Sequence, residues 1–150
     1  MTLKLATLED TEVLMPLVRA YHEFEGISTT DLERRESVTP LLRDPDLGRI
    51  WLIEKEGQVL GYIALCFGYS IEFGGRDAFL DEFFIAEAAR SHGIGRIALE
   101  AIKNEAAKFG VRVIHLEVAR TNLGAKQFYA KAGFAARERF HMMSCRLDTE

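Results

Sequence analysis

The chain has 150 residues, of which 48% are hydrophobic and 28% are charged, and its formal net charge is −4. This length and apolar content predict one globular domain over residues 1–150 with a hydrophobic core. A negative net charge argues against a nucleic-acid-binding protein, which normally carries a basic excess. We therefore expect small-molecule partners and no nucleic acid.

Two further classes of protein are disfavoured by simple features of the sequence. No stretch approaches the roughly 20 apolar residues of a membrane span, and the N-terminus lacks the basic-then-apolar order of a signal peptide. The two cysteines, Cys66 and Cys145, are far apart and form no CxxC motif, so we expect buried thiols in strands and no metal site. The sequence predicts a cytoplasmic protein that does not contact membranes.

The first 43 residues predict a strand followed by two helices. The strand covers residues 3–8, and the first helix begins near residue 10 and ends near Gly26. A second, more polar helix covers residues 30–43, and we expect Pro40 to interrupt it.

The middle of the chain predicts antiparallel strands. Residues 50–54 and 59–65 flank a short glycine-containing turn at 55–58, which is typical of a hairpin. Residues 67–76 contain three glycines and predict a loop. Residues 77–85 are rich in aromatic side chains and predict a central strand, although two adjacent carboxylates interrupt the apolar run.

The last third of the chain alternates helices and strands. An apolar stripe follows the glycine pair at 93 and 95 and predicts a helix that Gly110 terminates. A strand over 111–118, a helix over 125–132 and a closing strand over 140–147 follow. The fold class is therefore α/β, with a mixed sheet and helices on both of its faces.

The glycine pair, Gly93 and Gly95, admits three interpretations. With Ala98 and Glu117 it matches the dinucleotide-binding fingerprint, but residues 86–92 separate it from the end of the preceding strand and the upstream strands are antiparallel. A tight turn that only starts a helix is a second interpretation. The third uses the flanking arginines, Arg90 and Arg96. Glycine-opened amides at a helix N-terminus between two cations form an anion site suited to a pyrophosphate.

Two motifs resemble those of the GNAT superfamily of acyl-CoA-dependent N-acyltransferases. Residues 90–95 resemble its pyrophosphate-binding loop, R/Q-x-x-G-x-G/A, and residues 122–134 resemble its N-x-x-A-x-x-F-Y-x-K-x-G-F helix. The strand at 80–85 is most similar to that of the diamine or polyamine N-acetyltransferase branch, with its two acids in swapped order. The resemblance implies a three-layer fold, mostly antiparallel, in which the parallel strands 77–85 and 111–118 splay apart.

The resemblance also implies acetyl-CoA as cosubstrate and no metal. Backbone groups of the central strand would bond the pantetheine arm and polarise the thioester carbonyl, and the loop amides would hold the pyrophosphate. The residues implied to bind acetyl-CoA are Phe83, Phe84, Ile85, Arg90, Ser91, His92, Gly93, Ile94, Gly95, Arg96, Asn122 and Ala125.

Three residues are candidates for catalysis. By the resemblance, Tyr129 would protonate the departing CoA thiolate as general acid; the alternative is an aromatic side chain packed beside its neighbours. Asp81 aligns with the glutamate proposed as base in the polyamine branch, and Glu82 is the adjacent acid with the longer reach. On a regular strand the two acids face opposite sides unless a bulge intervenes. Both also fit a structural role, so the choice stays open.

The expected reaction is transfer of an acetyl group to a primary amine by direct attack in a ternary complex. The acceptor is a polyamine, an amino acid or another small amine, and the acids Glu23, Glu25, Asp31 and Glu72 would suit a cation. The alternatives are a protein N-terminus or lysine as acceptor, and a CoA-binding sensor without activity. His22 has no partner visible in the sequence. The exposed final strand is compatible with a homodimer.

Overall fold

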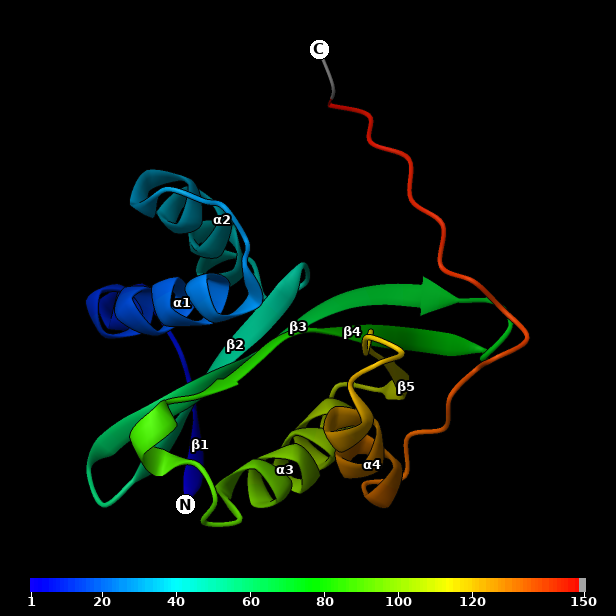
Figure 1. Ribbon diagram of the computed structural model, residues 1–150. Helices are drawn as coiled ribbons and strands as arrows, with labels where there is room; N and C mark the ends of the chain where they lie inside the picture. Colours follow the sequence, from blue (N-terminus) through cyan, green and yellow to red (C-terminus); the bar gives the residue numbers. More distant parts are fainter. Residues whose placement is uncertain (149–150) are drawn as a thin grey trace. The chain divides into compact units, whose positions relative to one another are not determined.

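The computed structural model describes residues 1–148, which divide into a unit at Met1–Glu117 and a second unit from Val118 onward, each described by itself. The first unit contains a five-stranded sheet and the helices α1, α2 and α3 (Figure 1). Its strands are β1 (Thr2–Leu5), β2 (Gly48–Lys55), β3 (Gln58–Ser70), β4 (Gly75–Ile85) and β5 (Val111–His115). Its helices are α1 (Thr11–Glu25), α2 (Asp31–Arg43) and α3 (Ile94–Lys108), with short 3₁₀ turns at Leu8–Asp10 and Glu87–Ala89.

The strands lie in the order in which the chain makes them, β1-β2-β3-β4-β5. Neighbouring strands are antiparallel except for β4 and β5, which are parallel and are connected through α3. Helices α1 and α2 cover one face of the sheet and α3 covers the other (Figure 1). The predicted mixed α/β architecture, mostly antiparallel with one parallel pair, is confirmed.

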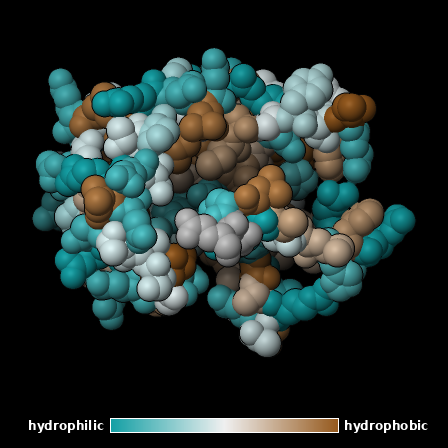
Figure 2. Space-filling model, turned by 90° about the horizontal axis from the view of Figure 1, so that it is seen from above, coloured by the Kyte–Doolittle hydropathy of each residue, from teal (hydrophilic) through white to brown (hydrophobic). Residues whose placement is uncertain are grey.

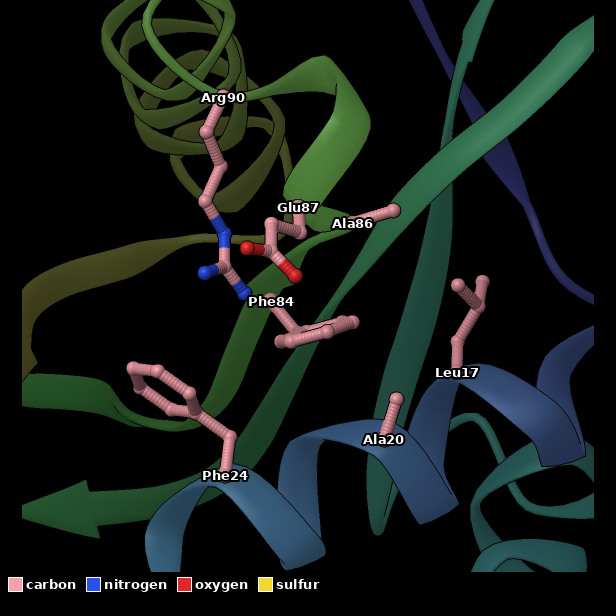
Figure 3. Close-up of a pocket in the computed structure, with 7 residues that line it drawn as sticks. All are labelled: Leu17, Ala20, Phe24, Phe84, Ala86, Glu87 and Arg90. Carbon is pink, nitrogen blue, oxygen red and sulfur yellow. The ribbon is translucent and has the colours of Figure 1, made fainter.

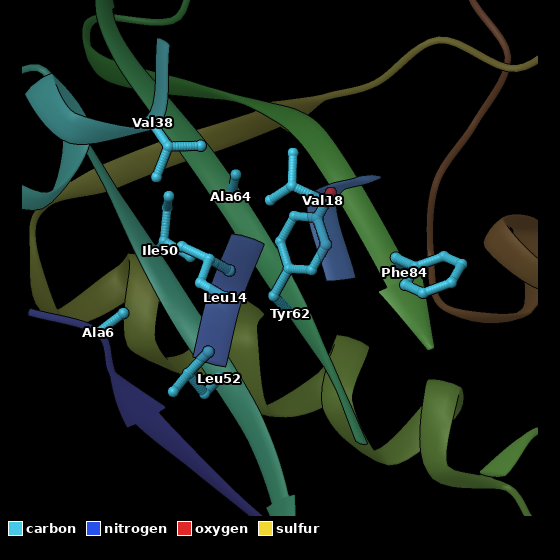
Figure 4. Packing of buried hydrophobic residues seen from close by; sticks show 9 residues of the cluster. All are labelled: Ala6, Leu14, Val18, Val38, Ile50, Leu52, Tyr62, Ala64 and Phe84. Atoms are coloured by element: carbon cyan, nitrogen blue, oxygen red, sulfur yellow. The ribbon is translucent and has the colours of Figure 1, made fainter. Parts of the chain in front are cut away.

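Hydrophobic side chains between the sheet and the two N-terminal helices form one core cluster (Figure 4). Leu14 and Val18, four residues apart on α1, are fully buried there because helical spacing puts them on one face. Gly26 ends α1 in the left-handed conformation, as predicted. The expected interruption of α2 at Pro40 is wrong. The helix continues to Arg43, and Leu41 and Leu42, which directly follow Pro40, pack against this cluster.

The predicted loop at residues 67–76 is also wrong. Strand β3 continues to Ser70 and β4 begins at Gly75, so these residues form a long hairpin. A cation–π contact joins its two arms, because the Arg76 guanidinium lies 5.1 Å from the centre of the Phe67 ring. The preceding hairpin forms as predicted, with Glu56 and Gly57 both at positive φ, the backbone signature of a type I′ turn.

The second unit contains helix α4 (Leu123–Lys131), which confirms the predicted helix within two residues. The strand expected at 140–147 is wrong, because residues 141–146 have no regular secondary structure and no strand pairs with them among the described residues. Met143 and Leu147 are more than 90% exposed. Cys145 is likewise exposed rather than buried, and Cys66 is half-buried. Strand β5 also ends at His115, three residues earlier than expected.

No helix within residues 1–148 combines the length and the hydrophobicity needed to cross a membrane. Hydrophobic side chains nevertheless reach the surface at several places. Figure 2 shows hydrophobic residues among hydrophilic ones on the face seen from above. Two of the exposed apolar side chains, Phe24 at 67% and Ile27 at 42%, come from the end of α1 and the segment that follows it.

Candidate active site

The two adjacent acids of β4 lie at a β-bulge. Leu80 pairs with Leu65 of β3 and Glu82 pairs with Ala64, so Asp81 is an extra residue opposite no partner. Such an insertion shifts the alternation of side chains along the strand by one residue. A bulge was the condition under which both acids could serve the same side of the sheet, and the structure fulfils it.

The bulge moves Glu82 to the face covered by α1 and α2. Ala64 and Phe84 belong to the core cluster on that face. Glu82 pairs with Ala64 and precedes Phe84 by two residues, so its side chain points to the same face as theirs. In a regular strand Glu82 would point to the same face as Leu80, which pairs with Leu65 on the other side. That face is lined by buried apolar residues, where an ionised carboxylate is strongly disfavoured.

On the α1 face Glu82 has two hydrogen-bond partners. The Tyr62 hydroxyl donates to Oε1 at 2.8 Å, and His22 Nε2 lies 2.7 Å from Oε2. The side chains of His22 and Glu82 are 12% and 19% exposed. Burial and the nearby Glu82 charge raise the pKa of Tyr62 far above its ordinary value, so this phenol stays protonated and donates.

His22 is the functional candidate that the sequence analysis missed. Its Nδ1 lies 2.8 Å from Thr29 Oγ1, and that hydroxyl oxygen accepts a hydrogen bond of 2.9 Å from Arg34 Nη1. The signal was present in the spacing, because His22 follows the buried Leu14 and Val18 at intervals of four residues on α1. A polar residue on that line faces the sheet.

Asp81 has a different environment from its neighbour. Its side chain is exposed, and among residues 1–148 it makes no hydrogen bond or ion pair. The surrounding protein nevertheless removes enough water to raise its pKa above the ordinary value. Burial, followed by the charge of Asp81, raises the pKa of the Cys66 thiol on β3 to about 11.

The parallel pair β4–β5 opens next to these acids. Pairing runs from Arg76 with Val111 to Phe79 with His115, and among the described residues no strand pairs with β4 on that side from Leu80 to Ile85. The predicted splay is therefore present. Backbone groups along a splayed edge need another partner, either water or a ligand.

The loop after β4 exposes the N-terminus of α3. Ser91 and Gly93 both have positive φ, at 70° and 74°, and within residues 1–148 no side chain caps the helix, which starts at Ile94. The first N–H groups of a helix have no partner within the helix and attract anions. The Arg90 side chain leaves this loop in another direction. Its Nε donates to the Ile85 carbonyl at 2.8 Å, so it fixes the loop to the end of β4.

A pocket of about 340 Å³ lies between α1 and the end of β4 (Figure 3). The Arg90 guanidinium lies 5.0 Å from the centre of the Phe24 ring and 5.3 Å from that of Phe84. Glu87 is the second charged residue of an otherwise apolar lining. Phe84 lines this pocket and lies on the same face of β4 as Glu82, so the pocket is next to the hydrogen bonds that Glu82 makes with His22 and Tyr62.

The remaining predicted site residues belong to the second unit. Asn122 caps α4, with its Oδ1 accepting from the Ala125 N–H at 3.1 Å. The Asn122 side chain therefore holds the first turn of this helix. Tyr129 packs edge-on against Phe128 and Phe134, with ring centres 5.1 and 5.7 Å away. Within residues 1–148 no group of three or more His, Cys, Asp or Glu side chains could hold a metal ion.

Comparison with known proteins identifies the family. Residues 13–134 match the model of the acetyltransferase (GNAT) family. The chain belongs to this family. The uncharacterised N-acetyltransferase YhfO of Bacillus subtilis (strain 168) is 25% identical to this GNAT chain over 134 residues, which are 89% of each protein.

Solved structures of similar proteins support the same fold. An integron cassette protein from the mobile metagenome of Cole Harbour Salt Marsh superposes with a TM-score of 0.85 at 32% identity, covering 99% of this chain and 91% of its own. A predicted acetyltransferase from Clostridium acetobutylicum, crystallised with acetyl-CoA, gives a TM-score of 0.76 at 21% identity and 95% coverage of both chains. The five-stranded sheet with parallel β4 and β5 is therefore the GNAT fold.

Proposed function

We propose that this GNAT protein transfers an acetyl group from acetyl-CoA to the primary amine of a small cationic molecule such as a diamine or polyamine. The observation that carries the proposal is the placement of two carboxylates, Asp81 and Glu82, at a bulge beside the splayed edge of β4. The edge suits a ligand with amide groups, and the acids suit an ammonium group. A ternary complex follows if both ligands are held at once.

Two features of the first unit fit acetyl-CoA. No strand lies beside β4 on its β5 side from Leu80 to Ile85 among the described residues, and Phe83, Phe84 and Ile85 are the residues proposed to bond the pantetheine arm along this edge. The uncapped amides from Ser91 to Arg96 would hold the pyrophosphate. A side chain at Gly93 would be strained in the left-handed conformation, so glycine keeps these amides accessible.

The two acids have different roles in this proposal. Asp81 has no hydrogen-bond partner within the described residues, and its raised pKa makes it a stronger base than an ordinary aspartate. Asp81 therefore takes the proton of the ammonium group and passes it to solvent. The Glu82 carboxylate is held in place by Tyr62 and His22 and attracts the cationic acceptor.

The chemical step then balances as follows. The amine lone pair forms a C–N bond at the thioester carbonyl carbon, and the C–S bond breaks. The departing thiolate takes a proton from Tyr129, and the phenolate recovers one from the nitrogen that becomes the amide. Asn122 and Ala125, at the start of α4, are proposed to lie along the cosubstrate. Tyr62 is unsuited to the role of acid, because its proton is bonded to Glu82.

The experiment is a measurement of CoA thiol release across polyamines, amino acids, aminoglycosides and lysine peptides, with acetyl-CoA binding measured by calorimetry. We expect turnover with polyamines, and a loss of about a hundredfold or more in Asp81→Asn and in Tyr129→Phe with unchanged acetyl-CoA affinity. Asp46→Asn removes an exposed acid of the α2–β2 loop and serves as the matched control.

Each other outcome selects a different function. Turnover confined to peptides would replace the small amine by a protein N-terminus or lysine. Acetyl-CoA binding without transfer to any class of acceptor would indicate a sensor. Absence of acetyl-CoA binding would contradict the proposal for the splayed edge and the α3 N-terminus.

A further inference from the structure

A continuous chain of hydrogen bonds leads from α2 to the carboxylate of Glu82. Arg34 is only 6% exposed, and its Nη1 donates to the Thr29 carbonyl as well as to Thr29 Oγ1. Its Nη2 donates to Asp31. From Thr29 the chain continues through both ring nitrogens of His22, at 2.8 and 2.7 Å, to Glu82 Oε2.

The chemistry of its members gives this chain one direction. A guanidinium group has donors only, so Thr29 Oγ1 accepts from Arg34 and has its own proton free to donate. We assign this proton to the hydrogen bond with His22 Nδ1, 2.8 Å away, in which Nδ1 is the unprotonated acceptor. A neutral imidazole with a bare Nδ1 carries its proton on Nε2, and this proton points to the Glu82 carboxylate. Every donor between Arg34 and Glu82 therefore points toward Glu82.

We infer that Arg34 and Thr29 fix His22 as the Nε2–H tautomer, and that His22 thereby acts as the positioning residue that orients Glu82 toward the acceptor amine. This inference rests on the proposed function. The same three side chains resemble a nucleophile, base and acid triad, but the Thr29 oxygen already accepts from a buried arginine. Thr29 is therefore a holding group, and His22 acts through Glu82 rather than on the substrate.

The first test is spectroscopic and does not need activity. Long-range ¹H–¹⁵N correlation spectra distinguish protonated from bare ring nitrogens, and loss of one signal set in His22→Gln assigns His22 among the four histidines. We expect a bare Nδ1 and a protonated Nε2. In Thr29→Val the Nδ1 resonance should move toward that of a nitrogen without a hydrogen bond, and Thr29→Ser should restore it.

The second test separates positioning from packing by kinetics. His22→Leu removes the donor to Glu82, and we expect the KM for the amine to rise about tenfold or more while the KM for acetyl-CoA stays unchanged. His22→Gln places an amide N–H near the position of Nε2, so it should remain within about threefold of the wild type. Thermal unfolding of both variants shows whether a lost fold explains any change.

The outcomes are distinguishable from failure of the proposed function. A wild-type spectrum with a protonated Nδ1 would overturn the inferred direction, whatever the activity. The expected spectrum with an unchanged KM for the amine in His22→Leu would overturn the positioning role. If no amine is acetylated at all, the proposed function fails, and amine binding by calorimetry in the same variants decides whether His22 orients Glu82.

Discussion

The two halves of β4 are built differently. From Arg76 to Phe79 the strand pairs with β3 on one side and with β5 on the other. From Leu80 to Ile85 it pairs with β3 alone, and the bulge at Asp81 interrupts even this pairing. The first half is paired with a strand on each side. The second half has no strand on its β5 side, and its side chains do not alternate regularly opposite β3 because of the bulge at Asp81.

The comparison shows how a sheet makes room for chemistry. In a strand with a neighbour on both sides the backbone groups are used in pairing, and successive side chains point strictly to opposite faces of the sheet. The open half of β4 exposes backbone groups along one edge, and its bulge brings Asp81 and Glu82 to the same region. The doubly paired half has a register shift of its own, between Arg76 and Asp77 in the ladder with β5, whereas the insertion at Asp81 lies where β4 has only β3 as a neighbour.

Deleting one residue in each half gives the largest expected effects and tests the comparison directly. Deletion of Asp81 leaves Glu82 next to Leu80, so every side chain of β4 keeps its face and the ladder with β3 becomes regular. We expect a folded protein that retains the Glu82–His22 contact but loses about a hundredfold or more of its transfer activity. Deletion of Ala78 shifts the register in the doubly paired half and should unfold the protein. Circular dichroism during heating and thiol release measure both effects.

If deletion of Asp81 unfolds the protein while deletion of Ala78 does not, the division of β4 into a doubly paired half and an open half is wrong. Retained activity in the Asp81 deletion would assign the base to Glu82. Asp81→Asn keeps the bulge and removes only the charge, so it separates the two functions of this residue.

A pair of glycines in β3 offers a test of intermediate size. A Cβ at Gly61 would lie 2.1 Å from the Phe84 carbonyl oxygen of the open half, a contact that only a backbone shift relieves. A Cβ at Gly68 would lie 2.7 Å from a carboxylate oxygen of Asp77, a side chain that moves easily. We expect Gly61→Ala to lower the free energy of unfolding by about 1–3 kcal/mol, and Gly68→Ala to change it by less than about 0.5 kcal/mol. Urea titration measures both values.

The same pair reports on the splayed edge. In Gly61→Ala the end of β4 has space only toward the gap, so we expect a weaker affinity for acetyl-CoA by calorimetry. Gly68→Ala lies in the paired half and should leave that affinity unchanged. Equal stability losses in the two variants would contradict the view that the halves differ in their tolerance.

Local patterns predicted most of the fold because they reflect local physics. The stripe at Leu14 and Val18 and the glycine stops at Gly26 and Gly110 depend on a few neighbouring residues. The segment 67–76 was predicted wrongly because its glycines resemble loop glycines. In the structure Gly68 and Gly75 are strand residues. Gly68 lets the Asp77 side chain approach and Gly75 lets the Arg112 side chain approach, and no local sequence pattern indicates either contact.

The site was predictable only in its motif-bearing parts. The glycine pair and the two acids stood out, but which acid is free depended on a bulge that no local pattern encodes. His22 and Thr29 lie about 60 and 50 residues from Glu82 along the chain, and only packing of α1 and its following loop on the sheet brings them together. Buried polar networks of this kind have no period and no short motif.

The smallest expected effect concerns how stability depends on pH in the two halves. The pKa of Asp81 is raised from its ordinary value of 3.8 in the folded protein. The pKa of Asp81 is therefore lower in the unfolded chain than in the folded protein. As pH increases through the interval between these two pKa values, the unfolded chain releases the proton first, so the wild type loses stability relative to Asp81→Asn. Below that interval both states hold the proton, and this contribution disappears. Urea unfolding between about pH 3 and pH 7 should show Asp81→Asn gaining stability over the wild type as pH rises, with Asp77→Asn as the matched change in the paired half. A gain in the opposite direction would mean that the folded protein stabilises the Asp81 charge, and that the free acid of the open half has a partner after all.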